Sequence, residues 1–216
     1  MTVEQTLPDP PSIDELRKIG IRRTESRTVR RSEIWWRVHC TEGDHVLAWN
    51  EFRTYGPLLR FDPHPEPEGE HPGHGVWYGG SVPGAALAEA FQQDRTIDRI
   101  RGAPYLTGLR FTRQLHLLDV ASDSAGAWPT RAGSNFAMST AAHAITQRWA
   151  RAIVGAFPDL DGIRYNGRFA GHACMALFAP AAAALSERPV SSQPLSHPGL
   201  AKRIASVADR VGYAMV

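Results

Sequence analysis

One carboxylate stands out because of its surroundings. Glu89 is the single acidic residue of the stretch GVWYGGSVPGAALAEAF, residues 75–91, where alanines flank it on both sides. If this stretch is helical, at least one alanine shares the side of Glu89, so we expect its side chain to be half buried. A buried acid usually needs a partner or a chemical task. Glu89 is therefore a candidate catalytic carboxylate, and a glutamate on the helix surface is the alternative.

Two arginines lie where a cation could bind an anionic ligand. Arg37 occupies the middle of the strand-like segment SEIWWRVHC, residues 32–40, and Arg60 belongs to LLRFDP, residues 58–63. The planar guanidinium group suits phosphate oxygens, which favours anion binding. Alternatively, each arginine is a structural residue whose guanidinium reaches the edge of a sheet. The residue types alone leave both interpretations open.

Other familiar chemistries have little support in the sequence. His64, His71 and His74 have the spacing H-x6-H-x2-H, but their loop is rich in proline and glycine and has no cysteines, which favours an accidental surface cluster over a metal site. Cys40 and Cys174 lie far apart in apolar, strand-like segments, so we expect two buried thiols rather than a disulfide framework. The motifs GxSxG and GxxxxGK are absent, and no GxGxxG follows a strand.

The chain has the size and composition of one globular unit. Its 216 residues are 43% hydrophobic and carry a formal net charge of +2. Single cores commonly serve up to about 250 residues. The arginines are scattered, so we expect no direct contact with nucleic acid. The polar start has no signal sequence and no apolar run reaches the roughly 20 residues of a membrane span, so we expect a cytoplasmic protein without membrane association.

Sequence patterns also predict the elements that would position these side chains. Ser12 and Glu15 form a capping box that opens a short helix. Ser81 is placed to cap a helix after a strand over residues 76–80, with Pro83 in its first turn. The remaining expectations are a strand over 32–40, a helix over 85–100, two strands within 106–120, an amphipathic helix over 139–157, a strand pair over 163–169 and 173–180, and a terminal helix over 199–216. Strand pairs with segregated helices predict an α+β domain with mixed or antiparallel sheets.

Taken together, these motifs resemble the RES-domain family, a family of toxins and related enzymes named for an Arg, a Glu and a Ser. The resemblance spans roughly Ile34 to Pro180 and rests on WRV, RFDP and VWYGGS, followed by a helix with one glutamate. Arg37 matches the arginine of the family's first strand. Arg60 matches the arginine of the family's G-R-F/W element, although Leu59 replaces the glycine here.

Further matches cover the opening stretch and the last strand pair. Tyr78 and Glu89 match the tyrosine of the family's second strand and the acid of the following helix. The place of the family serine is held by Tyr165-Asn166 in GIRYNGR. Asn166 can still donate and accept hydrogen bonds, but any role that requires a hydroxyl would be lost. Ser81 and the two glycines before it would let the backbone approach a ligand.

The resemblance implies an ADP-ribosyltransferase-like fold and NAD as the substrate, without a metal ion. Family members cleave the bond between nicotinamide and ribose and transfer ADP-ribose to phosphate, water or a protein. By this resemblance, Arg37 and Arg60 hold the pyrophosphate, and Tyr78 packs against nicotinamide or ribose. Ser81 and Asn166 are the other candidate NAD-binding residues. Glu89 would stabilise the oxocarbenium ion and orient or activate the nucleophile. Arg37 and Tyr78 are the other candidate catalytic residues.

Three activities remain open at this point. The first is an NAD-consuming toxin that transfers ADP-ribose to phosphate or water, for which the resemblance implies a helix-turn-helix antitoxin as partner. The second is a protein ADP-ribosyltransferase, and the third is a module that binds NAD or ADP-ribose but has lost turnover. Residues 31–216 would form the catalytic domain, and residues 1–30 a flexible arm with a short helix. This arm would dock a partner, dock a second copy in a homodimer, or remain a solvated extension.

Overall fold

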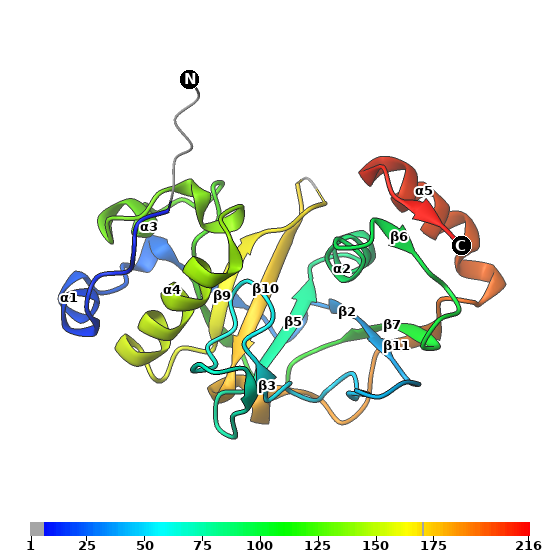
Figure 1. Ribbon diagram of the computed structural model, residues 1–216, viewed down its shortest axis with the longest axis horizontal. Coiled ribbons are helices and arrows are strands. Elements are labelled where there is room, and N and C mark those ends of the chain that lie inside the picture. The colour runs from blue at the N-terminus through cyan, green and yellow to red at the C-terminus, as the bar shows by residue number, and fades with distance from the viewer. Residues whose placement is uncertain (1–6, 170) are drawn as a thin grey trace.

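An eight-stranded sheet runs through the described residues of the computed structural model, which are 7–169 and 171–216 (Figure 1). Its strands are β1 (Ser26–Val29), β2 (Trp35–Cys40), β5 (Val76–Gly80), β7 (Pro104–Leu109), β8 (Leu115–Asp119), β9 (Gly162–Asn166), β10 (Ala173–Phe178) and β11 (Ser191–Pro194). Short strands pair β3 (Tyr55–Gly56) with β4 (Gly69–Glu70), and β6 (Thr96–Ile97) with β12 (Ala214–Met215). The α-helices are α1 (Ile13–Ile19), α2 (Pro83–Ala90), α3 (Trp128–Arg131), α4 (His143–Ala156) and α5 (Ala201–Val211). The 3₁₀ helices are η1 (Arg23–Glu25), η2 (Phe136–Ser139), η3 (Ala179–Ala184) and η4 (Pro198–Leu200).

The strand order along the sheet is β1-β8-β9-β10-β5-β2-β7-β11. Neighbouring strands pair antiparallel throughout, except that β8 and β9 are parallel. Helices α3 and α4 lie on the side of β9 and β10, whereas α2 and α5 lie on the side of β2 and β7 (Figure 1). This architecture confirms the predicted α+β class and is consistent with the ADP-ribosyltransferase-like fold that the resemblance implies.

The sheet divides between β2 and β5. These two strands are joined at one position, Trp36 opposite Gly80, whereas β2 pairs with β7 from Trp35 to Cys40. Beyond that position the two halves diverge, and the side chains at the split are free to line a cavity. A Cβ atom at Gly80 would lie 2.6 Å from the backbone nitrogen of Ala86, so glycine is needed for the close approach of α2 to β5.

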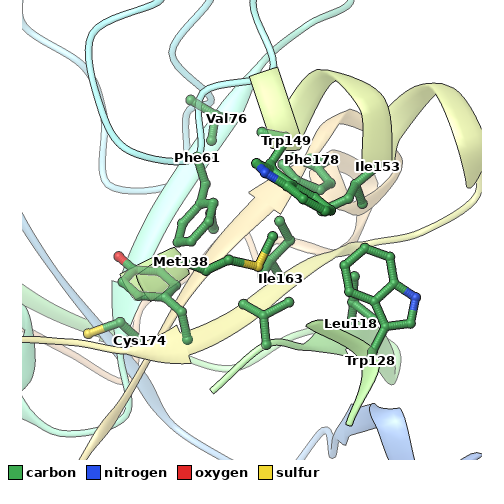
Figure 2. Packing of buried hydrophobic residues seen from close by; sticks show 14 of the residues in the cluster. Phe61, Val76, Leu118, Trp128, Met138, Trp149, Ile153, Ile163, Cys174 and Phe178 are labelled. Atoms are coloured by element: carbon green, nitrogen blue, oxygen red, sulfur yellow. The ribbon is translucent and has the colours of Figure 1, made fainter. Parts of the chain in front are cut away.

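The larger core lies between α4 and the half of the sheet that contains β9 and β10. Trp149 and Ile153 of α4 are fully buried, which confirms the predicted amphipathic helix. Figure 2 shows them packed with Ile163 of β9 and Phe178 of β10. Each such side chain contributes about 1.5–3 kcal/mol through burial. This core fixes β9, and therefore the segment that follows it, against the rest of the fold.

The smaller core holds α2 against α5 and the half of the sheet with β7. Leu87 of α2, Leu106 of β7 and Ile204 of α5 are buried in it. The predicted terminal helix is confirmed in part as α5, which ends at Val211 before Gly212, a residue with a left-handed φ of 69°. Residues 214–215 form β12 instead of continuing the helix. Since α2 carries Glu89 at its last turn, this second core positions the candidate carboxylate.

Several local predictions need correction. Ser81 does not cap α2, because Val82 is the N-cap residue and the backbone nitrogen of Ser81 donates to the oxygen of Ala173, 2.8 Å away. Pro83 does begin the helix, as expected, but α2 ends at Ala90 instead of continuing to residue 100. The chain turns there, and residues 96–97 become β6, because they pair with the C-terminal β12. That partner is distant in sequence.

The two cysteines differ from each other. Cys174 is buried as predicted, whereas Cys40 is exposed because it is the last residue of β2, at the end of the strand. The capping box of α1 is confirmed, with Ser12 N donating to a Glu15 carboxylate oxygen at 2.9 Å. Among the described residues, no helix is long and apolar enough to cross a membrane.

The N-terminal segment packs against the domain. Residues 1–6 of the predicted arm lie outside the described residues. From Leu7 onward the chain contacts the main core, because Leu7 is buried and Trp149 donates its indole N–H to the oxygen of Pro8 at 2.8 Å. A solvated extension therefore does not describe residues 7–11. The domain boundary near residue 30 stays a prediction.

Candidate functional site

A cavity of about 270 Å³ opens at the split between β2 and β5. Four residues selected from the sequence line it: Arg37, Arg60, Tyr78 and Glu89. They come from β2, the loop over residues 57–63, β5 and α2. The remaining lining residues are Trp36, Val38, Leu47, Arg53, Leu59, Val76, Gly79, Ala86, Ala90, Gln92, His143 and Tyr165. The fold thus brings together chemistry that is spread over half the chain.

A second cavity, of about 300 Å³, adjoins the first. The two share Arg60, Glu89, Gln92 and Tyr165. The second also has polar groups of its own, from Ser122, Ser139, Thr140, Asn166, Gly167 and Arg168. Within the described chain, Ser81 lines neither cavity, so the structure does not bring it together with the other candidates. Glu89 therefore lies where the two cavities meet.

The carboxylate of Glu89 is held by two donors from the end of β9. The hydroxyl of Tyr165 donates to Oε2 at 3.2 Å, and the backbone N–H of Arg168 donates to Oε1 at 2.8 Å. The side chain is half-buried, as the alanine-rich context predicts. Hydrogen bonds to a carboxylate favour its charged form. The alternative of a free surface glutamate is thereby wrong.

Arg37 has a charge that is available to a ligand. Its guanidinium lies 5.6 Å from the centroid of the Trp77 ring and donates to the backbone oxygen of Glu51 at 2.7 Å. Burial, followed by the nearby charge of Arg53, lowers the pKa of Arg37 to about 10. The group is therefore still protonated at neutral pH. Among the described residues it forms no ion pair.

Arg60 bridges the two cavities. It donates to the backbone oxygen of Ala141, and burial lowers its pKa, with the charge of Arg168 acting in the same direction. The charge of Glu89 acts the other way and raises the pKa. The guanidinium groups of Arg60 and Arg168 repel each other beside the single carboxylate of Glu89, so this region has a net positive charge. Such a region favours an anionic ligand over a neutral one.

Asp62 organises the first cavity, and sequence analysis missed it. Its side chain is fully buried and accepts two bonds from Arg53 at 2.7 Å, together with bonds from the N–H groups of Leu58 at 2.6 Å and Leu59 at 2.9 Å. It thus neutralises Arg53 and shapes the loop that carries Arg60. The available signal was an acid directly after LLRF, a segment with three apolar residues, because a charge buried there needs partners.

The hydroxyl of Tyr78 is occupied by the protein. It donates to Asp62 at 2.9 Å and accepts the N–H of Phe61 at 3.0 Å. Burial raises the pKa of Tyr78 well above its usual range, with the charge of Asp62 adding to the effect. Tyr78 therefore does not serve as an acid or base near neutral pH. Its aromatic ring is what it can offer to a ligand.

Asn166 is also engaged, at the rim of the second cavity. Its oxygen accepts from the N–H of Ser122 at 2.6 Å and from the hydroxyl of Ser122 at 3.0 Å, while its amide nitrogen donates to Asp123 at 3.1 Å. These bonds hold the loop after β8 against β9. The amide is thus positioned as a wall of the cavity, with little capacity left to bind a ligand.

The histidines do not form one surface cluster. His64 is fully buried, and its Nε2 lies 3.2 Å from the oxygen of Arg53, so the predicted surface cluster is wrong for this residue. His71 is 6.0 Å away between ring centroids. Within residues 7–169 and 171–216, no group of three or more His, Cys, Asp and Glu side chains could hold a metal ion.

Three comparisons relate this chain to known proteins. The family model described as the RES domain matches residues 34–197, which is more than half of the chain. A search of the curated proteins finds no match. Among solved structures, the chain is similar to one described as the crystal structure of the M. tuberculosis MbcT-MbcA toxin-antitoxin complex, with a TM-score of 0.48 and 16% sequence identity. That similarity covers 86% of this chain and 92% of the other.

Proposed function

The chain belongs to the RES-domain family, and from this premise we propose that it is an NAD-consuming enzyme. It would cleave the bond between nicotinamide and ribose and transfer ADP-ribose to phosphate or water. One observation carries the proposal: Arg37, Arg60, Tyr78 and Glu89 line a single cavity, although they come from four separate segments. Family membership also confirms the resemblance seen in the motifs of the sequence.

The proposed chemistry follows from charge. Departure of nicotinamide leaves a positive oxocarbenium ion, which a nearby carboxylate stabilises. Glu89 would supply this carboxylate, since two hydrogen bonds fix its oxygens where the two cavities meet. Nicotinamide leaves as a neutral molecule from a cationic precursor, so no strong general acid is required. Tyr78, whose hydroxyl stays protonated, would contribute a ring surface to the first cavity.

The two cavities suggest how substrate and acceptor are divided. The apolar walls of the first cavity suit nicotinamide and its ribose, and Arg37 and Arg60 would bind the anionic diphosphate. The second cavity contains hydroxyl groups, including Ser122, and meets the first at Glu89. A small polar acceptor such as water or phosphate would approach the ribose from there. Glu89 would then be placed to orient it.

A binding module that has lost turnover is the second candidate, and Asn166 favours it. The resemblance assigns a serine to this place, but the Asn166 amide is committed to Ser122 and Asp123. A role that needs a free hydroxyl would then have no provider at this position. Such a module would bind NAD without forming a product.

We further propose a helix-turn-helix antitoxin as partner and the cytoplasm as location, as the resemblance implies for a toxin. Co-purification with the product of the neighbouring gene tests the partner. Light scattering of the purified chain tests a homodimer. A monomer that binds no neighbouring gene product would contradict both partner proposals.

Incubation of the purified protein with NAD, in the presence and absence of phosphate, tests the proposed activity. We expect NAD to decrease and nicotinamide to appear in equal amount, with ADP-ribose or its phosphate as the second product. Tight binding of NAD without product would favour the module. Labelled protein in a lysate supplied with labelled NAD, with little loss of free NAD, would favour a protein ADP-ribosyltransferase. Unchanged NAD without binding would refute all three activities.

A further inference from the structure

We propose that Tyr165 is a positioning residue for Glu89, because its hydroxyl donates to the carboxylate and holds it at the junction of the two cavities. This inference rests on the proposed function, in which Glu89 acts on the substrate. Tyr165 itself was singled out in the sequence only for its place beside Asn166. Its contact with Glu89 joins residues 76 positions apart in the chain.

The ring of Tyr165 is a rigid support. It is 3% exposed, and its centroid lies 4.9 Å from that of Phe61 in the main core. In the sheet, Tyr165 pairs directly with Cys174 of β10. A ring buried on this scale keeps its hydroxyl at one point in space. The Tyr165 hydroxyl therefore constrains where the Oε2 atom of Glu89 can lie.

The two oxygens of the carboxylate have different donors. Oε2 accepts from the Tyr165 hydroxyl at 3.2 Å, and Oε1 accepts from the backbone N–H of Arg168 at 2.8 Å. The backbone donor is present whatever the side chain at 168, whereas the hydroxyl is supplied by residue 165 alone. Of the two donors to Glu89, the Tyr165 hydroxyl is therefore the one that a side-chain substitution can remove.

The tyrosine keeps its proton. Burial raises the pKa of Tyr165 well above its usual range, and the charge of Glu89 raises it further. The hydroxyl is therefore a donor over the whole range in which a carboxylate titrates. The other titratable groups facing Glu89 are Arg60 of the 57–63 loop, Arg168 after β9, Cys174 of β10 and Tyr213 after α5. Burial raises the pKa of Cys174 well above its usual range, so its thiol is neutral and places no second negative charge beside Glu89.

Removal of the hydroxyl should act on protonation as well as on position. Loss of a hydrogen bond to a charged group changes the equilibrium or rate constant that depends on it by a factor of about 10 to 100. Tyr165→Phe should thus lower kcat for NAD cleavage by about 10- to 100-fold, with a small change in KM. The pH at which Glu89 takes up its proton should rise by about one unit. A residue that only packs the core would not produce this second effect.

Tyr213→Phe is the matched control. Tyr213 also loses a hydroxyl bonded to α2, but its partner is the backbone oxygen of Ala88 at 3.2 Å rather than the carboxylate. The midpoint of Glu89 is read from its side-chain carboxyl ¹³C signal as a function of pH, assigned with Glu89→Gln. We expect Tyr165→Phe to raise the midpoint and Tyr213→Phe to leave it in place.

An unchanged midpoint in a folded Tyr165→Phe protein would overturn the inference. If that variant does not fold, replacement of Tyr165 by 3-fluorotyrosine keeps the ring and makes the hydroxyl a stronger donor, so the midpoint should fall. An unchanged midpoint there would overturn the inference equally. The NMR readout does not depend on catalysis. A shifted midpoint in a protein that never cleaves NAD would support the contact and refute the proposed function.

Discussion

Asp62→Asn should destabilise the protein, because Asp62 holds the segments beside the first cavity together. The substitution keeps the shape of the side chain but replaces one acceptor oxygen by an NH₂ group. The hydrogen-bond partners of Asp62 among the described residues are donors: the Arg53 guanidinium, the N–H groups of Leu58 and Leu59, and the Tyr78 hydroxyl. The buried Nδ1 of His64 lies farther away, 3.7 Å from Oδ2. The new NH₂ group would therefore face donors, and a buried donor without an acceptor is destabilising.

The magnitude follows from the burial of the pair. The side chain of Asp62 is 0% exposed and that of Arg53 is 14% exposed, so the substitution leaves a cation without its counter-charge in a nearly dry site. Breaking such a pair from one side costs about 3–5 kcal/mol. In a domain of this size, 1 kcal/mol corresponds to about 2–4 °C in Tm. We therefore expect Tm to fall by about 6–20 °C.

Differential scanning calorimetry measures this fall, with Asp94→Asn as the control at an exposed site. The double variant Arg53→Met with Asp62→Asn removes both charges, so it should recover part of the loss. A Tm change of about 1 °C or less in Asp62→Asn, or a double variant less stable than the sum of the single effects, would refute the role of Asp62 as the buried ion-pair partner of Arg53.

Three further predictions concern other parts of the structure. Arg37→Ala should raise KM for NAD and lower kcat/KM by about 10- to 100-fold, because it removes a positive charge that could bind the diphosphate. Steady-state kinetics measure this, with Arg110→Ala as the exposed control, and equal kinetics for the two variants would contradict it. Gly167→Ala should reduce the free energy of unfolding by about 1–3 kcal/mol, because the new methyl group would collide with the sulfur of Cys174. Urea titration measures this free energy, and a value equal to that of the wild type would contradict the prediction. Burial lowers the pKa of His39 from 6.5 to about 4, with Arg37 adding to the effect, so the unfolded chain binds the extra proton and stability should fall as pH drops from 6.5 toward 4. His39→Gln should flatten this decline in urea titrations, and an equally steep decline in both proteins would contradict it.

The sequence predicted the features that depend on neighbours along the chain. The capping box at Ser12, the strand around Arg37 and the amphipathic helix that contains Trp149 follow local periodicity, and each is confirmed. Half-burial of Glu89 also followed from the alanines around it. These features need no knowledge of what lies across the sheet.

The features that failed depend on how the chain folds rather than on the pattern of neighbouring residues. Helix α2 was predicted too long because β12, which captures residues 96–97, lies more than 110 positions away. Ser81 was predicted as the cap, but α2 has its N-cap one residue later, at Val82. Asp62 was missed because its role depends on Arg53 and Tyr78, which the fold alone brings beside it. The candidate site was thus predictable in its residue types, but its supporting network was not.

Release of nicotinamide from NAD by wild-type protein, Glu89→Gln and Glu187→Gln tests the central claim most directly. Glu187 is an exposed glutamate that lines neither of the two cavities, and it serves as the matched control. The account predicts equal rates for wild type and Glu187→Gln, and a rate lower by about 100- to 1,000-fold for Glu89→Gln, because the carboxylate that stabilises the oxocarbenium ion is lost. Equal rates for all three proteins, or no release by the wild type, would contradict it.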